Sequence, residues 1–358
     1  MRIRIHIAMG AMALASMANL SSAQSLAAFG PSGDYLRFSG LLDLGVGRVI
    51  NKSAAGVKAT VSELHQAGSG GSVLDWVGRE NLGGGMYTGF LLETSIQTDT
   101  GGIGSLPTGP YFNRTSAVYL GNNWGELALG QVRTPTYSNI VFHDPMFNNG
   151  YNGSMKLISP LGTRVNSLYQ NINSINYFLP PGAGGGFYGH VQATFPEGQP
   201  NQKYFGWNFG YAKGPMDIGV ARGTTETTPG NPDYVMTNVG GSYDFGILKL
   251  IGFYVNSKYG DASQNVYLAG VTFPIGVNQI KLSYSRGRYS GGALGGASAN
   301  AAGVQVIHFL SKRVGIYGNF ARVNNSGKAA FRLPTPQNTA STLGGSSTGF
   351  DAGLRLAF

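Results

Sequence analysis

The stretch Thr134–Ile172 reads TPTYSNIVFHDPMFNNGYNGSMKLISPLGTRVNSLYQNI, and it differs from the sequence on either side of it. It is rich in Asn, Gly, Pro and Ser and shows no alternation of polar and apolar residues. A segment of this length without regular structure, inside a compact domain, is usually a functional loop. One acid (Asp144) and two bases (Lys156 and Arg164) distinguish it from a flexible Gly/Ser linker. The pattern predicts a loop around which the rest of the chain folds.

The residues outside this loop alternate between polar and apolar with the period of two that is typical of β-strands. In Tyr35–Val46, for example, Leu36 and Phe38 fall on one face, while Arg37 and Ser39 fall on the other. No run of helical length with a helical period competes with these segments. The pattern predicts an all-β fold with sixteen strands, near residues 35–50, 72–80, 86–98, 111–120, 126–133, 173–179, 187–195, 203–213, 216–224, 234–244, 247–257, 264–273, 278–288, 300–310, 314–323 and 349–358.

The predicted connections alternate between short and long. Turns such as Asn81–Gly85 (NLGGG) are short, whereas the connections near 51–71, 134–172 and 258–263 are long and polar. Short turns at one end and long loops at the other are typical of outer-membrane barrels. A membrane-spanning sheet also has to close, because lipid offers no partner for unpaired backbone groups. We therefore predict a sixteen-stranded antiparallel transmembrane β-barrel whose last strand, ending at Phe358, pairs with the first.

The N-terminus has the features of an export signal. A basic start containing Arg2 precedes the apolar run Ile5–Leu20, and small residues follow as far as Ala23. This arrangement predicts a secretory signal peptide over residues 1–23. Residues 24–358 are then predicted to form a single barrel domain. No other stretch reaches the 18 or more apolar residues that a membrane-spanning helix needs.

The composition is unusual for a soluble domain. Only 11% of the residues are charged, compared with about 25% in typical globular proteins, and Gly accounts for 57 of 358 residues. Frequent Gly and aromatic residues suit a sheet whose two faces meet different solvents. The chain has no Cys, which excludes disulfides, thiolate nucleophiles and Cys-built metal sites. The net charge of +9, or +7 without the two signal-peptide arginines, is dispersed, so a nucleic-acid-binding tail is excluded.

Several motifs, in their order and spacing, resemble the general trimeric porins of the Gram-negative outer membrane, and in particular their beta-proteobacterial branch. They extend over the mature chain: RENLGGG (Arg79–Gly85), RTSAVYLG (Arg114–Gly121), GELALGQVRTP (Gly125–Pro135), DPMF (Asp144–Phe147) and AGLRLAF (Ala352–Phe358). The resemblance implies a homotrimer of sixteen-stranded barrels in outer-membrane lipid, reached by export through the periplasm. It implies that the third long loop folds into each lumen, that no cofactor is used, and that Phe358 belongs to an assembly signal.

The resemblance also implies that arginines of the wall face acids of the loop at a constriction. This chain departs from that pattern, because Gln131 and Gln170 stand where arginines are usual. In the second strand, Val73 and Val77 stand where pairs of basic residues are usual. Other bases therefore have to supply the positive charge of the constriction.

The alternation within strands identifies charged side chains that lie opposite apolar neighbours and hence point into the lumen. Together with the charged residues of the loop, the predicted pore-lining set is Arg37, Asp43, Arg79, Arg133, Asp144, Lys156, Arg164, Lys281 and Arg355. Bases outnumber acids in this set, and basic residues in a pore favour anions. The predicted function is an outer-membrane diffusion porin that passes small hydrophilic solutes and ions with a mild anion preference.

Two sequence matches to enzyme motifs lack the structural context that the chemistry needs. Gly184–Gly189 (GGGFYG) fits a dinucleotide-binding pattern and Gly345–Gly349 (GSSTG) fits a hydrolase pattern, but a strand follows each where the chemistry needs a helix. The four histidines beyond the signal lack the spacing of a metal site. A substrate-selective channel of the same fold, a barrel enzyme and a soluble secreted β-rich binding protein remain as alternatives.

Overall fold

The computed structural model describes residues 33–104, 110–180, 182–335 and 342–358. Within these residues the chain forms seventeen β-strands, one short α-helix and two 3-10 helices. The strands are β1 (Tyr35–Lys52), β2 (Lys58–Gln66), β3 (Val73–Gly83), β4 (Met86–Ser95), β5 (Thr115–Asn122), β6 (Gly125–Arg133), β7 (Gln170–Phe178), β8 (Phe187–Thr194), β9 (Tyr204–Lys213), β10 (Met216–Thr225), β11 (Tyr234–Asp244), β12 (Lys249–Tyr259), β13 (Ala262–Ile275), β14 (Asn278–Ser290), β15 (Ser298–Phe309), β16 (Val314–Ser326) and β17 (Ser346–Ala357). The helices are α2 (Pro135–Phe142), η3 (Gly150–Asn152) and η4 (Ser154–Leu157).

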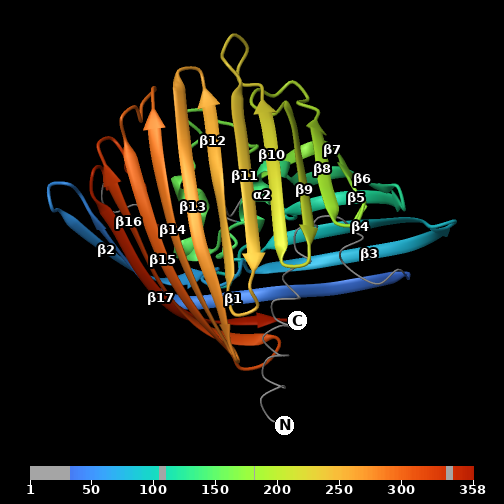
Figure 1. Ribbon diagram of the computed structural model, residues 1–358, viewed down its shortest axis with the longest axis horizontal. Coiled ribbons are helices and arrows are strands. Elements are labelled where there is room, and N and C mark those ends of the chain that lie inside the picture. Colours follow the sequence, from blue (N-terminus) through green and yellow to red (C-terminus); the bar gives the residue numbers. More distant parts are fainter. Residues whose placement is uncertain (1–32, 105–109, 181, 336–341) are drawn as a thin grey trace.

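The strands form one sheet that closes on itself, with antiparallel neighbours throughout (Figure 1). The ring closes where β1 pairs with β17, from Leu41 opposite Ala357 to Lys52 opposite Ser346. Phe358 extends this pairing, because its N–H donates to the carbonyl of Gly40 at 3.0 Å. Closure leaves no sheet edge exposed to lipid.

β2 and β3 share one position in the ring. β2 pairs with the C-terminal half of β1, and β3 pairs with its N-terminal half. Seventeen strands within the described residues therefore fill sixteen positions, and the predicted sixteen-stranded antiparallel barrel is confirmed. The prediction that residues 51–71 form a loop is wrong, since β2 lies within them. β2 alternates, but its outward positions include Thr60 and Ser62, so it lacks the apolar face that marked the other strands.

The predicted long connection near 258–263 is also wrong. β12 and β13 form a continuous hairpin in which Tyr259 pairs with Ala262. Only Gly260 and Asp261 make the turn, and Gly260 has a φ of +56°, a conformation that glycine adopts without steric cost. Polar residues in this stretch extend the strands beyond their apolar parts.

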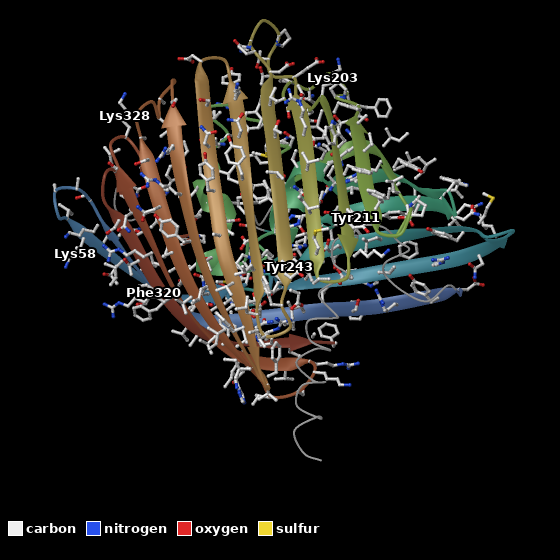
Figure 2. The ribbon with its side chains drawn as sticks, viewed as in Figure 1. Lys58, Lys203, Tyr211, Tyr243, Phe320 and Lys328 are labelled. Carbon is white, nitrogen blue, oxygen red and sulfur yellow. The ribbon has the colours of Figure 1, made fainter. Side chains whose placement is uncertain are left out.

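The two faces of the sheet have opposite character. Apolar side chains such as Leu36 (78% exposed), Phe320 and Leu354 point outward, while polar side chains point into the lumen. Figure 2 shows Phe320 on the outer surface, Lys58, Lys203 and Lys328 near the ends with longer connections, and Tyr211 and Tyr243 toward the opposite ends. This is the pattern of a barrel with lipid outside and water inside. No helix among the described residues is long and apolar enough to span a membrane.

The connection between β6 and β7, residues 134–169, lies inside the ring of strands, where Figure 1 shows its green segment and α2. We call it the constriction loop. Its first part, α2, packs on β8–β11, and η3 and η4 pack on β14–β16. The predicted loop folded into the lumen is therefore present, although β7 begins at Gln170, two residues before the predicted loop would end.

Candidate pore constriction

The constriction loop begins with a capped helix. Thr134 precedes α2, and its hydroxyl accepts a hydrogen bond from the backbone N–H of Tyr137 at 3.2 Å. Pro135 occupies the first helical turn, where its missing N–H is not needed. The Thr-Pro pair therefore starts the helix at the point where the chain leaves β6.

Neutral amides attach α2 to the wall behind it. The amide of Asn139 donates to the side-chain oxygen of Asn238 at 2.7 Å and to the carbonyl of Gly219 at 3.2 Å. Asn238 in turn donates to the backbone carbonyl of Thr136 at 3.1 Å. These buried hydrogen bonds satisfy polar groups of the helix and the wall at the same time.

The second half of the loop is held in the same way. Gln264 donates to the carbonyl of Ser159 at 2.7 Å and accepts from its N–H at 2.9 Å. The hydroxyl of Tyr289 donates to the carbonyl of Leu157 at 2.5 Å, and Asn152 donates to the carbonyl of Val304 at 3.2 Å. These hydrogen bonds between the loop and strands β10 to β15 use uncharged donors and acceptors, and the His143 ring of the loop also lies 3.6 Å from the Asp217 carboxylate of β10.

Asp144, the acid of the loop, is occupied within the loop itself. Its carboxylate accepts hydrogen bonds from the backbone N–H groups of Met146 (2.8 Å), Asn148 (3.1 Å) and Ser154 (3.1 Å), and the residue is 0% exposed. Burial raises the pKa of Asp144, and the hydrogen bonds act against this shift. Asp144 therefore stabilises the conformation of the loop from within.

The bases on or near the loop have three different environments. Lys156 donates from Nζ to the carbonyl of Gly153, and burial lowers its pKa to about 8. Arg164 is exposed. Lys281, on β14, is 2% exposed, and its Nζ lies 5.3 Å from the centre of the Phe147 ring. Lys156 and Arg164 are therefore carried by the loop, while Lys281 lies behind it.

The wall that the loop leaves uncovered carries a cluster of charges. The Arg114 Nε lies 2.8 Å from Glu93 Oε1, and the Arg133 guanidinium lies 3.5 Å from the same oxygen. Thr115 donates its hydroxyl to the other Glu93 oxygen at 3.0 Å. One carboxylate thus holds two guanidinium groups side by side on β4–β6. We call these three charged residues the arginine wall.

Two further predicted residues lie on the adjoining strands. Arg37 of β1 pairs with Val77 of β3, and the next inward pair joins Ser39 with Asp75, so Arg37 and Asp75 are diagonal neighbours on the lumenal face. Arg79 lies farther along β3, toward the turn at Gly83–Gly85, with its guanidinium 3.7 Å from the centre of the Tyr87 ring. Arg37 therefore adjoins the arginine wall, and Arg79 lies toward the end of the barrel with short turns.

The two glutamines that replace expected arginines have a backbone role. Gln131 donates to the carbonyl of Phe112 at 3.5 Å, and Gln170 donates to the carbonyl of Asn113. These carbonyls belong to the two residues before Arg114, so the glutamines help to position it. Val77, at another departure from the family pattern, is fully buried in an apolar cluster.

Three segments converge near Arg114. A Cβ atom built on Gly71 would lie 3.5 Å from Arg114 Nη1 and 3.8 Å from Asn149 Oδ1 of the loop. The gap between wall and loop tip at this point is therefore small. Tyr137 and Tyr169, whose ring centres are 5.2 Å apart, add aromatic surface on the loop side. The space between the arginine wall and the constriction loop is therefore the candidate for the narrow passage.

Asp43 and Arg355 lie at the join between β1 and β17, where they face each other across the strands. Asp43 is fully buried, and its carboxylate accepts from the N–H groups of Gly68 (3.1 Å), Ser69 (2.9 Å) and Gly70 (2.9 Å). Arg355 donates to the Ser69 hydroxyl at 3.3 Å. Asp43 therefore fixes the connection between β2 and β3, and Arg355 lies beside it.

A cavity of about 630 Å³ opens on the other side of the loop tip. Lys156, Arg332 and His65 are among its polar lining residues, and Tyr169 and Phe331 are among its aromatic ones. It is a basic vestibule between the constriction loop and the connection that follows β16.

Arg114 and Glu93 were not among the predicted site residues, although both occur in the motifs that carry the family resemblance. The strand predicted near 111–120 gives Arg114 the parity of the outward-facing Val118 and Leu120, but β5 begins only at Thr115, so alternation does not apply to Arg114. Glu93 shares the lumenal parity of Leu91 and Ser95, which was a usable signal. No group of three or more His, Cys, Asp or Glu residues suited to a metal ion occurs in the described part of the chain.

Comparisons with known proteins agree with this geometry. A family model described as Gram-negative porin matches residues 10–328. The chain is 31% identical over 336 residues to outer membrane porin protein 32 of Delftia acidovorans, which covers 89% of this chain and 93% of that protein. The structure of this chain is similar to that of the anion-selective porin from Comamonas acidovorans, with a TM-score of 0.81 and 29% identity. The match covers 91% of this chain and 100% of the Comamonas chain.

OmpT, an outer membrane protein of Vibrio cholerae, has the same fold with a TM-score of 0.66, 12% identity, and coverage of 92% and 98%. The family match confirms the predicted outer-membrane location and the predicted diffusion of small hydrophilic solutes through a β-barrel channel. With a closed barrel, a loop inside its lumen and a charged passage beside that loop, the chain belongs to the Gram-negative porin family.

Proposed function

We propose that this porin prefers anions and that the arginine wall carries the preference. The proposal rests on an excess of positive over negative side chains along the narrow passage. Glu93 is shared by Arg114 and Arg133, and Arg37 and Asp75 adjoin them, so three bases stand against two acids. Asp144 and Asp43 are each held by three backbone N–H groups away from the passage.

The loop and vestibule add to the same bias. Lys156 and Arg332 line the basic vestibule, and Arg164 is exposed on the loop. Charges at the narrowest point dominate, because a Debye length of about 8 Å at physiological salt screens those near the wide mouths. The relative from Comamonas acidovorans is an anion-selective porin, which supports the same direction. The preference should therefore decline as salt rises.

Transport is by diffusion, with size exclusion between loop and wall, and without chemistry on the solute. His190 bonds to the Asn176 amide, and Asp43 accepts from the Gly68 backbone N–H and the Tyr317 hydroxyl, so these buried groups serve as structural partners. A substrate-selective channel of the same fold would show conductance that saturates with one solute. A barrel enzyme would lose hydrolytic activity on a single Ser→Ala substitution.

Reversal potentials across a planar bilayer with a KCl gradient test the proposal. The proposal predicts a potential of the sign given by chloride permeation at low salt, which shrinks as both salt concentrations are raised. A potential of the opposite sign at low salt would contradict the charge assignment, while the porin fold would stand.

The assembly of the channel is also part of the proposal. We propose that residues 1–23, which lie outside the described residues, are a signal peptide, and that the mature chain forms a homotrimer. A trimer form of the Vibrio cholerae protein shares this fold, which is consistent with a homotrimer.

Phe358 pairs with Gly40 at the closing seam, and its ring lies 5.7 Å from that of Phe38. Deletion of Phe358 is expected to reduce folded trimer in the outer membrane, as measured by heat-modifiable gel mobility. Unchanged amounts of trimer would argue against an assembly role.

A further inference from the structure

The tip of the constriction loop is attached to the barrel wall through one aromatic side chain. Tyr151, in η3, is 0% exposed, and its hydroxyl donates to Glu63 of β2. Its ring stacks on His65, with ring centres 3.9 Å apart and planes at 29°. Burial and the negative charge of Glu63 raise the pKa of Tyr151, so its hydroxyl remains a donor at any physiological pH. The tip is thus held by a stack and a hydrogen bond to the same strand.

Two glycines of the wall make room for this side chain. Gly47 of β1 pairs with Glu63 on one side and Asp351 on the other, and it contributes no side chain to the lumen between them. A Cβ atom on Gly47 would overlap the Tyr151 hydroxyl, and one on Gly349 would lie 3.1 Å from its ring. The socket for Tyr151 is therefore built into β1 and β17.

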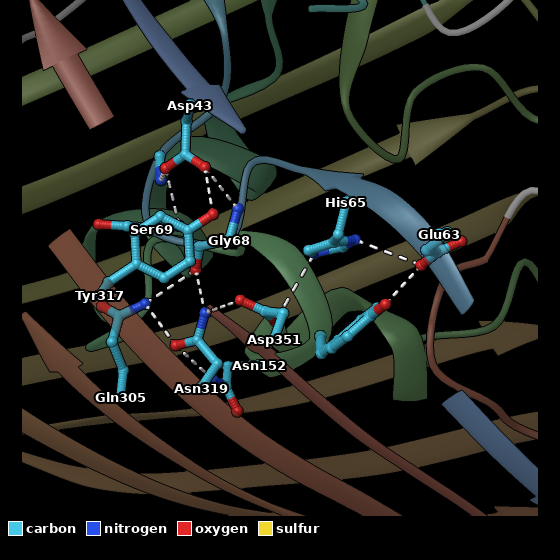
Figure 3. Close-up of polar contacts among 12 residues, drawn as sticks. Asp43, Glu63, His65, Gly68, Ser69, Asn152, Gln305, Tyr317, Asn319 and Asp351 are labelled. Atoms are coloured by element: carbon cyan, nitrogen blue, oxygen red, sulfur yellow. Dashed lines mark hydrogen bonds and ion pairs between the residues drawn. The ribbon is translucent and has the colours of Figure 1, made fainter. Parts of the chain in front are cut away.

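His65 lies at the centre of this attachment, between two acids of different strands. Its Nδ1 is 3.4 Å from Glu63 Oε1, and its Nε2 is 3.9 Å from Asp351 Oδ2. Figure 3 shows the imidazole between the two carboxylates, with Asn319 on the far side of Asp351. Among the described residues, neither His65 Nε2 nor Asp351 Oδ2 has a hydrogen-bond partner. Both ring nitrogens thus face a buried carboxylate.

We propose that His65 is a positioning residue whose charge sets how firmly the loop tip is held, so that the effective width of the pore depends on pH. With both nitrogens protonated, the ring offers an N–H to each carboxylate and offsets their mutual repulsion. When the ring loses its proton, one carboxylate faces a nitrogen lone pair. The attachment is therefore stronger with the protonated ring than with the neutral ring.

The other charged groups around His65 do not reverse this direction. The carboxylate of Asp43 is held by backbone N–H groups and by the Tyr317 hydroxyl at 2.7 Å. Lys156 and Arg332 line the same vestibule as His65, and both are cationic near neutral pH. Histidine is the side chain that ordinarily changes charge between pH 5 and 8, and the variants below test whether His65 carries the response.

The inference rests on the channel function and not on the proposed anion preference, and the experiment uses uncharged solutes to keep the two separate. The swelling rate of proteoliposomes is measured with neutral sugars of increasing size, at about pH 5.5 and about pH 7.5. In the wild type, the larger sugars are expected to enter faster at the higher pH. His65→Gln, which cannot be protonated, is expected to lose this difference.

The matched control is His190→Gln. His190 is another buried histidine of the inner wall, but it stacks on Phe178 and bonds to Asn176, and no acid among the described residues forms an ion pair with it. This control should keep the wild-type pH difference. Tyr151→Phe, which removes only the hydroxyl on Glu63, should admit larger sugars at the lower pH. Each variant is first checked for heat-modifiable trimer, and His65→Asn replaces His65→Gln if the latter does not fold. A His65 variant that retains the full pH difference, or a control that loses it, would overturn the proposal.

Discussion

The two sides of the lumen carry different kinds of side chain, because one side supports the constriction loop and the other faces the passing solutes. Behind the constriction loop, the wall offers neutral groups such as Asn238, Gln264 and Tyr289, which bond to loop backbone or amides. On the side that the loop leaves open, the wall offers Glu93, Arg114 and Arg133. Neutral donors and acceptors make most of the contacts behind the loop, with Lys281 and the pair of His143 and Asp217 (3.6 Å) as exceptions, and the cluster of Glu93, Arg114 and Arg133 stands on the side that the loop leaves open.

This difference follows from the cost of burying charge. An ion taken out of water beneath the loop loses hydration that its partner only partly returns. An amide pays a smaller penalty and can satisfy both a donor and an acceptor of the loop backbone. Along the open wall, the guanidinium groups keep contact with water and their field reaches the passing ion. The loop therefore decides which wall residues act on solutes.

Removal of the loop tip is expected to have the largest effect. Deletion of residues 148–152 removes both the narrow point near Arg114 and the Tyr151 attachment, so single-channel conductance should rise several-fold. An equal deletion within the connection 291–297, between β14 and β15, serves as the control and should change conductance little. Equal conductance in the two deletion variants would mean that the narrow passage lies elsewhere.

Charge reversal on the open wall should come next. In water, each unit charge at about 5 Å from the ion path contributes about 0.8 kcal/mol, and Arg133→Glu changes the charge by two units, so it should lower the chloride permeability relative to that of potassium by at least about tenfold at low salt. Arg322→Glu is the matched control, because Arg322 is exposed on β16 and its guanidinium bonds to Asn324. If both variants shifted the reversal potential alike, the preference would come from overall charge and not from the wall.

Titration of Lys156 should give a smaller change. Its pKa of about 8 lies below the usual value because of burial, so the side chain is charged below pH 8 and neutral above it. A charge at about 10 Å in water contributes about 0.4 kcal/mol, so anion preference should fall by about twofold between about pH 7 and pH 9. Lys156→Gln should show the lower preference throughout. A pH dependence unchanged in this variant would assign the titration to another group.

Loss of a neutral anchor should leave ion preference unchanged. Gln264→Ala removes two hydrogen bonds to Ser159 and is expected to cost about 1 kcal/mol of stability, because the half-buried Ser159 N–H loses its partner while the Ser159 carbonyl keeps the Tyr234 hydroxyl at 3.3 Å. The measurement is the temperature at which the folded band is lost on a gel, with the reversal potential as a second readout. A shift in reversal potential as large as that of Arg133→Glu would remove the distinction between the two walls.

Much of the barrel was predictable from sequence, and much of the passage was not. Strand alternation placed Arg37, Arg79 and Arg133 on the lumenal face because a period of two assigns each residue to one side. It did not identify β2, whose outward residues are partly polar. Nor did it indicate that Asp144 would be enclosed by its own loop. The sequence around a loop carboxylate does not distinguish one that faces water from one that accepts backbone N–H groups.

The residues that bind the loop could not be predicted from the sequence for a different reason. Gln264 and Ser159 are 105 residues apart, and Arg114 is positioned by carbonyls that Gln131 and Gln170 bind across other strands. Such contacts depend on the closed ring and on how far the loop extends inside it. The motifs containing Glu93 and Arg114 were visible, but their side-chain directions depend on the geometry at the start of β5.

The central claim, that solutes pass along the open wall and not behind the loop, can be tested by thiol accessibility. The chain contains no native cysteine, so single cysteines can be introduced at Arg114 on the open wall and at Asn238 behind α2. A charged, membrane-impermeant thiol reagent is then added to single channels in a bilayer. The account predicts that Arg114→Cys reacts rapidly and that the current falls, whereas Asn238→Cys is unaffected. Rapid block through Asn238→Cys with no effect at Arg114→Cys would contradict it.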